Sequence, residues 1–211
     1  ISMSDTSNKV SFGAGAILSP VPAVIVTCGT LDAPNAMTAA WTGTVNTVPP
    51  KVYVSIRKER YSYGIIAESG EFVINLTSEE LVRAADYLGV RTGKNEQKLK
   101  TLGLSVSPSQ KLSAPVLDAS PLSIECRVDR VIPLGSHDMF IADVVAVDVQ
   151  SSLIDENGRL CLDRARLTAY CHGEYFALGK KLGCFGFSVR KKRRQSNASR
   201  TAKPKKQPRS K

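Results

Sequence analysis

Residues 35–43 read NAMTAAWTG and place the only tryptophan of the chain, Trp41, among alanine, threonine and glycine. Little bulk is available there to pack an indole ring. A backbone with small side chains can approach a flat molecule closely, with Trp41 or Met37 on the face of that molecule. The stretch therefore predicts contact with a planar ligand. The alternative is that Trp41 is an ordinary core aromatic residue.

A second informative stretch, VYVSIRKERYSY (residues 52–63), follows soon after. A strand is predicted to end here and a helix to begin, so that hydroxyl and guanidinium groups surround a helix N-terminus. Free amide donors, the helix dipole and charge-assisted hydrogen bonds together suit a phosphate group. The alternative is an exposed basic turn with ordinary capping. Taken with residues 35–43, the stretch indicates a site for a flat heterocycle that carries a phosphate.

The remaining pattern predicts mainly β structure with helical insertions, an α+β class built on an antiparallel barrel. Apolar, β-branched runs predict core strands over residues 22–29, 52–56 and 71–76. Helices are expected from Tyr61 to Gly70, from Ser78 to Leu88 with Thr77 and Glu80 in capping-box spacing, and within residues 95–103. Two long strands, 121–134 and 138–150, flank a predicted hairpin turn at residues 135–137.

Composition limits the protein classes that need to be considered. With 211 residues and 42% hydrophobic content, the chain can bury one substantial core. Five cysteines at irregular spacings, no signal-type leader and no long apolar run predict a cytoplasmic protein with reduced thiols and no membrane span.

Several common catalytic motifs are missing from the sequence. It contains no GxxxxGK[ST], GxGxxG, GxSxG or HExxH signature. A metal site from Cys161, Cys171, His172 and Cys184 lacks the close ligand pairs typical of such sites, so no metal is expected.

The net charge of +10 is concentrated at the C-terminus. Eleven of the 29 Lys and Arg residues lie from Arg190 onward with no acidic residue, and the 18 others nearly balance the 19 acidic residues. We therefore expect an N-terminal extension over residues 1–10, one domain over 11–189 and a basic disordered tail over 190–211. The tail is expected to be a solvated terminus, or else to bind polyanions weakly and without reading bases.

Five segments occur in the order of a known family: residues 35–41, Pro49-Pro50 with VYVSIRKERYSY, GEFVINL (70–76), GSHDMFIADVVAV (135–147) and GEYFALGKKLG (173–183). Together they resemble the flavin reductase-like, FMN-binding split-barrel proteins, and most closely the flavoredoxin-type branch. The resemblance covers residues 11–189 and implies an antiparallel split β-barrel that binds FMN.

The resemblance also implies roles for individual residues. A loop from Asn35 to Trp41 would contact the flavin ring, through Asn35, Trp41 and the backbone groups of Met37 and Thr38. Residues of the 52–63 stretch, joined by one further basic residue, would hold the phosphate: Ser55, Arg57, Arg60, Tyr61, Ser62 and Lys98. His137 would lie near the ring and the nicotinamide; otherwise it is an ordinary turn residue. Tyr175 and Phe176 would cover the site across a homodimer interface.

The function implied by this resemblance is that of an FMN-dependent oxidoreductase. It would act as an NAD(P)H-dependent flavin or metal reductase, or as a flavoredoxin-like carrier that exchanges electrons with a small molecule or redox protein. The cofactor supplies the redox chemistry, so no paired catalytic carboxylates are required. The alternative is a non-catalytic flavin-binding module whose tail binds nucleic acid or a membrane surface.

Overall fold

The computed structural model describes residues 8–190 of the chain, so most of the predicted basic tail and of the N-terminal extension lies outside the described residues. The described residues up to Leu178 form one compact unit, and those from Gly179 belong to a second. In the second unit the only regular element described is a 3-10 turn, η4 (Phe187–Val189). The predicted domain boundary at residue 189 stays a prediction.

The first unit is built mainly from antiparallel strands, as the sequence predicts. Its strands are β1 (Val24–Gly29), β2 (Pro34–Ala39), β3 (Thr42–Thr47), β4 (Pro50–Ile56), β5 (Glu71–Leu76), β6 (Val106–Ser107), β7 (Val116–Leu117), β8 (Leu122–Pro133), β9 (Asp138–Val149), β10 (Thr168–Cys171) and β11 (Glu174–Ala177). Its helices are α1 (Tyr61–Ser69), α2 (Val82–Val90) and α3 (Lys98–Thr101), with 3-10 turns η1 (Glu79–Leu81), η2 (Ser151–Leu153) and η3 (Leu162–Arg164).

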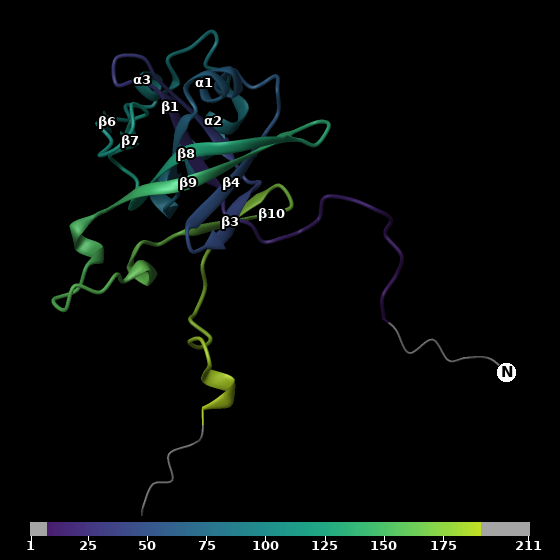
Figure 1. Ribbon diagram of the computed structural model, residues 1–211. Coiled ribbons are helices and arrows are strands. Elements are labelled where there is room, and N and C mark those ends of the chain that lie inside the picture. The colour runs from purple at the N-terminus through teal and green to yellow at the C-terminus, as the bar shows by residue number, and fades with distance from the viewer. Residues whose placement is uncertain (1–7, 191–211) are drawn as a thin grey trace, which may run out of the picture. The chain divides into compact units, whose positions relative to one another are not determined.

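Seven strands form one sheet in the order β2-β1-β5-β8-β9-β4-β3, and every neighbouring pair is antiparallel. The two edge strands, β2 and β3, follow one another in the chain, so the sheet curves back on itself without closing. Register shifts in the β8–β9 ladder mark bulges, which increase curvature. Helix α1 packs on one face of β1, and α2 and α3 pack on the opposite face. Figure 1 shows all three helices at the upper end of the view. The predicted split-barrel fold class is confirmed.

Strand β1 is buried on both faces, which explains why its sequence is almost continuously apolar. Val24, Val26 and Cys28 face a core that includes Phe72 and Phe140. Ile25 faces a second core on the opposite side, formed with the apolar residues of α2 and α3. A strand buried on both faces needs apolar residues at every position rather than at alternate ones. Strand β1 therefore packs against both cores and lies next to β2.

Two local predictions need correction. Residues 35–41, expected as a loop, form strand β2 and its following turn, because packing against β1 and α2 outweighs the low strand propensity of alanine. The helix expected from Ser78 begins as η1 and continues as α2 to Val90. The capping box is not formed, since Thr168 N donates to Thr77 O and Glu79 N to Arg166 O, and Thr77 Oγ1 is buried without a partner.

The other local predictions agree with the structure. Helix α1 ends at Gly70, which has the left-handed conformation expected of a helix C-cap. The 135–137 turn joins β8 to β9, and Leu134 N donates to His137 O at 3.0 Å. Within residues 8–190, no helix is long and apolar enough to cross a membrane.

Candidate functional site

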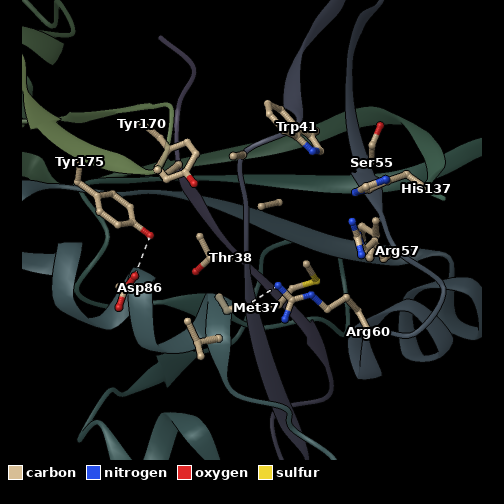
Figure 2. Close-up of a pocket in the computed structure, with 17 residues that line it drawn as sticks. Met37, Thr38, Trp41, Ser55, Arg57, Arg60, Asp86, His137, Tyr170 and Tyr175 are labelled. Atoms are coloured by element: carbon tan, nitrogen blue, oxygen red, sulfur yellow. Dashed lines mark hydrogen bonds between the residues drawn. The ribbon is translucent and has the colours of Figure 1, made fainter. Parts of the chain in front are cut away.

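A cavity of about 360 Å³ lies where β2, the end of β4, α2 and the β10–β11 hairpin meet (Figure 2). We call it the ring cavity. Its lining includes six residues singled out from the sequence as ring or phosphate contacts, together with His137 and Tyr175: Met37, Thr38, Trp41, Ser55, Arg57, Arg60, His137 and Tyr175. Phe176 does not line this cavity and is half exposed on β11.

Strand β2 provides one wall of the ring cavity. It pairs only with β1, and within the described residues its other edge joins no strand. Every second N–H and C=O of an edge strand therefore points away from its neighbour. The Thr38 hydroxyl donates to Ala85 O of α2, so this side chain anchors the strand to the helix. The free edge at residues 37–39 offers main-chain donors and acceptors to a flat heterocycle.

Trp41 lies in the turn between β2 and β3 and is not a core aromatic, because 37% of its surface is exposed. Ser55 N donates to Trp41 O at 2.8 Å, and Thr42 Oγ1 donates to Tyr53 O at 2.6 Å. These bonds tie the turn to β4. Figure 2 places the indole at one end of the cavity, above Ser55 and His137. The ring is therefore held as a wall of the cavity.

The opposite wall combines Tyr175, a residue that the resemblance implies, with two residues that the sequence reasoning did not select, Tyr170 and Asp86. Tyr170 of β10 and Tyr175 of β11 stack edge to face with ring centroids 5.3 Å apart. Tyr175 Oη donates to Asp86 Oδ1 of α2 at 3.5 Å, as Figure 2 shows. The signal for Tyr170 was present, since His172-Gly173 is a hairpin turn with two positive φ angles between aromatic residues. No comparable signal marks Asp86.

Arg57 and Arg60 occupy different places. Arg57 is exposed on the ring cavity, on the side of Ser55 and His137 (Figure 2). Arg60 Nη2 donates to Gly89 O at the end of α2 at 2.5 Å. The Gly89 carbonyl therefore orients the Arg60 guanidinium at the floor of the cavity.

A smaller pocket of about 130 Å³ adjoins the ring cavity and shares Met37 and Arg60 with it. We call it the cationic pocket, because Arg60, Arg91 and Lys98 all line it. It lies at the N-terminus of α1, where Ser62 Oγ accepts a hydrogen bond from Asn35 Nδ2 at 2.7 Å. The structure thus brings Arg60, Ser62 and Lys98 together as predicted from the sequence.

Lys98 is the most unusual residue of the cationic pocket. Only 4% of its surface is exposed, and Nζ donates to Arg91 O at 3.1 Å and to Leu88 O at 3.4 Å. No ion pair joins Lys98 to a carboxylate within residues 8–190. Burial, followed by the nearby charge of Arg60, lowers the Lys98 pKa to about 8. A buried ammonium without a carboxylate partner is suited to an incoming anion.

His137 lies at the β8–β9 turn and lines the ring cavity as well as a second apolar hollow beside Trp41. Its Nδ1 is 3.0 Å from Ser136 Oγ. This contact holds the imidazole on the same side of the ring cavity as Arg57 (Figure 2). Among residues 8–190, no three side chains of metal-ligating type come together.

Comparison with known proteins agrees with this fold and cavity. The family model of the flavin reductase like domain matches residues 18–179, and the chain belongs to this family. The solved flavoredoxin of Desulfovibrio vulgaris (Miyazaki F) is 33% identical, with a TM-score of 0.80 over 86% of this chain and all of that chain. The predicted resemblance to the flavoredoxin-type branch is therefore confirmed.

Two further relatives widen the comparison. The FMN-binding protein from Thermus thermophilus, solved with bound 1-cyclohex-2-enone, is 22% identical with a TM-score of 0.71 over 84% of this chain and 98% of that one, a likeness of fold. The FMN reductase (NADH) RutF of Pseudomonas syringae pv. syringae is 27% identical over 125 residues, which cover 58% of this chain and 68% of the relative.

Proposed function

We propose that the protein binds FMN and is a flavin-dependent oxidoreductase. The observation that carries this proposal is the buried Lys98, which forms no ion pair within residues 8–190 and lies beside Arg60 in a pocket that adjoins the ring cavity. One cavity provides the open strand edge and aromatic walls that suit a planar ring. The other provides the cations that suit a phosphate. FMN has both of these parts, and the residues present fit it.

Each wall would have its own task in this function. The edge of β2 at Met37 and Thr38 would orient the ring, while Trp41 and Tyr170 would exclude water from it. Arg60 and Lys98 would anchor the phosphate, and Ser55, Tyr61 and Ser62 remain proposed contacts near it. Bound FMN supplies the hydride and electron transfer chemistry. Arg57 and His137 would place positive charge and a ring N–H beside the approaching electron donor or acceptor.

The proposal can be tested with the intrinsic fluorescence of the protein. Trp41 is the only tryptophan of the chain and lies on the ring cavity, so its emission reports on binding there. Titration with FMN should quench it saturably with one flavin per chain. Riboflavin, which has the ring but no phosphate, should bind more weakly. Equal affinities for the two flavins, or no quenching, would contradict the proposal.

Oxidation of NADH or NADPH by the FMN-bound protein distinguishes a reductase from an electron carrier. A flavin or metal reductase should oxidise NADH or NADPH with a small acceptor, whereas a flavoredoxin-like carrier should need a redox protein. The RutF relative is an FMN reductase (NADH), which favours the reductase. A chain that binds FMN without turnover with any donor would be the non-catalytic module. We place the protein in the cytoplasm, where its five free thiols would stay reduced.

We expect FMN affinity to depend on pH through Lys98. The free pKa of Lys98 is about 8, and a bound phosphate dianion would raise it. Affinity should therefore be highest between about pH 6.5, where the phosphate is a dianion, and pH 8. It should fall by up to about tenfold per pH unit above 8, until the raised pKa of the complex is reached. Titrations from pH 6.5 to 9.5 check this, and riboflavin should show no such fall.

The protein is also proposed to be a homodimer whose subunits cover each other's flavin sites. Exposed apolar side chains occur on the N-terminal segment, at the tip of the β8–β9 hairpin and on β11: Val10, Phe12, Ile17, Leu18, Val131, Ile132, Leu134 and Phe176. Such side chains favour burial in an interface. Light scattering should give twice the chain mass of 22.8 kDa, and Ile132→Lys should shift the equilibrium toward monomer. A monomer that still binds flavin would contradict the proposal.

A further inference from the structure

The amine of Lys98 is placed to react with a molecule in the cationic pocket. Within residues 8–190, its Nζ has two hydrogen-bond partners, the carbonyl oxygens of Arg91 at 3.1 Å and Leu88 at 3.4 Å. The unprotonated amine keeps both bonds, because it still has two N–H groups. Its lone pair takes the remaining direction, on the side of the pocket that Lys98 lines. The unprotonated form of Lys98 can therefore attack a molecule bound there.

The surroundings of Lys98 favour this unprotonated form. Burial, followed by the charge of Arg60, lowers the Lys98 pKa to about 8, so about a tenth of the amine is uncharged at pH 7. Glu96 and Cys28 act in the opposite direction, but burial raises the pKa of the Cys28 thiol, which stays neutral. Glu59 is the only carboxylate among the described residues that line the pocket, and it is exposed. A desolvated lysine of this kind is a nucleophile.

The cationic pocket selects small molecules that carry a phosphate. Arg60 and Arg91 line it together with Tyr61, and guanidinium groups suit the oxygens of a phosphate. A volume of about 130 Å³ accommodates a phosphate with a short acyl group, but not a whole nucleotide. In an acyl phosphate, one bridging oxygen separates the phosphorus from an electrophilic carbonyl carbon. A phosphate bound by the arginines therefore brings that carbon close to Lys98.

We propose that Lys98 is an acylation site, which small acyl phosphates modify when the cationic pocket holds no other anion. The lone pair of Nζ attacks the carbonyl carbon, and the bond from this carbon to the bridging oxygen breaks. That oxygen leaves with the electron pair as phosphate, which takes up the proton released by the amine. The products are an amide and hydrogen phosphate, so no oxidant or reductant is required. Arg60 and Arg91 stabilise the charge that develops on the departing phosphate.

Acylation would also control the binding of flavin. It removes the charge of Lys98 and adds an acyl group that occupies part of the pocket. FMN affinity of the acetylated chain should therefore fall about tenfold or more, and FMN bound beforehand should protect Lys98 from acetylation. The acylation itself does not depend on the proposed function, whereas this consequence rests on it. A high concentration of acyl phosphate would thus lower the fraction of chains that bind flavin.

The test is acetylation of the flavin-free full chain by acetyl phosphate, followed at each lysine by peptide mass spectrometry. Lys100 is the internal control, because it is exposed and does not line the cationic pocket. We expect Lys98, although only 4% exposed, to react about tenfold faster than Lys100 or more at pH 8. Inorganic phosphate should slow the reaction at Lys98 alone. At low acetyl phosphate concentration, the Lys98 rate should rise about fifteenfold from pH 6.5 to pH 8 and level off near pH 9.

Two variants test the role of the guanidinium groups. Arg91→Ala keeps the carbonyl oxygen that Lys98 Nζ contacts and removes the guanidinium, so the Lys98 rate should fall about tenfold while the Lys100 rate is unchanged. Arg83→Ala is the matched control, since Arg83 is exposed and lies outside the pocket, and it should change neither rate.

The outcomes separate this inference from the proposed function. Equal rates at Lys98 and Lys100 would overturn the inference and leave the proposed function intact. A Lys98 rate that neither inorganic phosphate nor Arg91→Ala lowers would overturn it as well. Selective acetylation of Lys98 in a chain that does not bind FMN would support the inference and contradict the proposed function.

Discussion

Replacing Arg60 by alanine and Lys98 by methionine is expected to weaken FMN binding at least about a hundredfold. Each lost charge-assisted hydrogen bond to the phosphate costs about 1.5–3 kcal/mol, and two such losses exceed the 2.8 kcal/mol or so that corresponds to a factor of 100. Methionine has nearly the shape of lysine and no charge to desolvate, so the buried position should tolerate it. Titrations of Trp41 fluorescence with FMN measure the change.

Riboflavin provides the decisive control for this variant. It lacks the phosphate, so its affinity should change less than about threefold in the double variant. Arg83→Ala with Lys94→Met removes the same two charges from exposed positions that line neither the ring cavity nor the cationic pocket and should leave FMN affinity unchanged. If the double variant still prefers FMN over riboflavin as the wild type does, the phosphate does not lie in the cationic pocket.

The variant Arg57→Ala tests whether Arg57 contacts the phosphate or the flavin ring. The sequence predicts a phosphate contact, whereas Arg57 lines the ring cavity and not the cationic pocket. From that position we expect similar losses for FMN and riboflavin. A loss confined to FMN would instead support the phosphate contact that the resemblance implies. The two flavins thus distinguish these assignments without any change in method.

Much of the fold was predictable because its signals are local. The apolar run of β1 predicts a strand buried on both faces, and the glycines at residues 70 and 135 mark a helix end and a hairpin turn. Strand β2 was missed because its alanines carry no strand signal of their own. Its conformation is determined by pairing with β1, residue by residue from Pro34 to Ala39, which local propensity cannot reveal.

One wall of the ring cavity could be predicted from the sequence, whereas most of the opposite wall could not. The family motifs indicate Trp41, Ser55, Arg57 and Arg60, which follow one another closely in sequence and line one cavity. Asp86 and Tyr170 are brought to it by packing of α2 and β10, so no spacing in the sequence connects them. Burial of Lys98 is likewise a tertiary effect, and its low pKa follows from that burial. A property that depends on burial, such as the pKa of Lys98, can therefore be assigned only from the structure.

Asn75→Ala is expected to destabilise the protein by about 3–4 kcal/mol. Asn75 is fully buried in β5, and its amide donates to Ile25 O at 3.0 Å and Thr27 Oγ1 at 2.9 Å. Its Oδ1 accepts from Leu117 N at 3.0 Å and from Ser123 Oγ at 2.7 Å. Truncation removes one partner from each of these buried groups, and each group left unsatisfied costs about 1–3 kcal/mol in such surroundings. Urea unfolding of the flavin-free protein measures the loss.

Asn46→Ala is the matched control, because its amide makes one exposed bond, to Pro49 O at 2.8 Å, and it should cost less than about 1 kcal/mol. The comparison also tests whether the Asn75 network supports the flavin site through β1 and β2. At an FMN concentration one hundred times the dissociation constant of the wild type, FMN should stabilise wild type and Asn75→Ala equally, by about 2.7 kcal/mol. A smaller increment in the variant would contradict this, since it would mean that the network also holds the free edge of β2 in place.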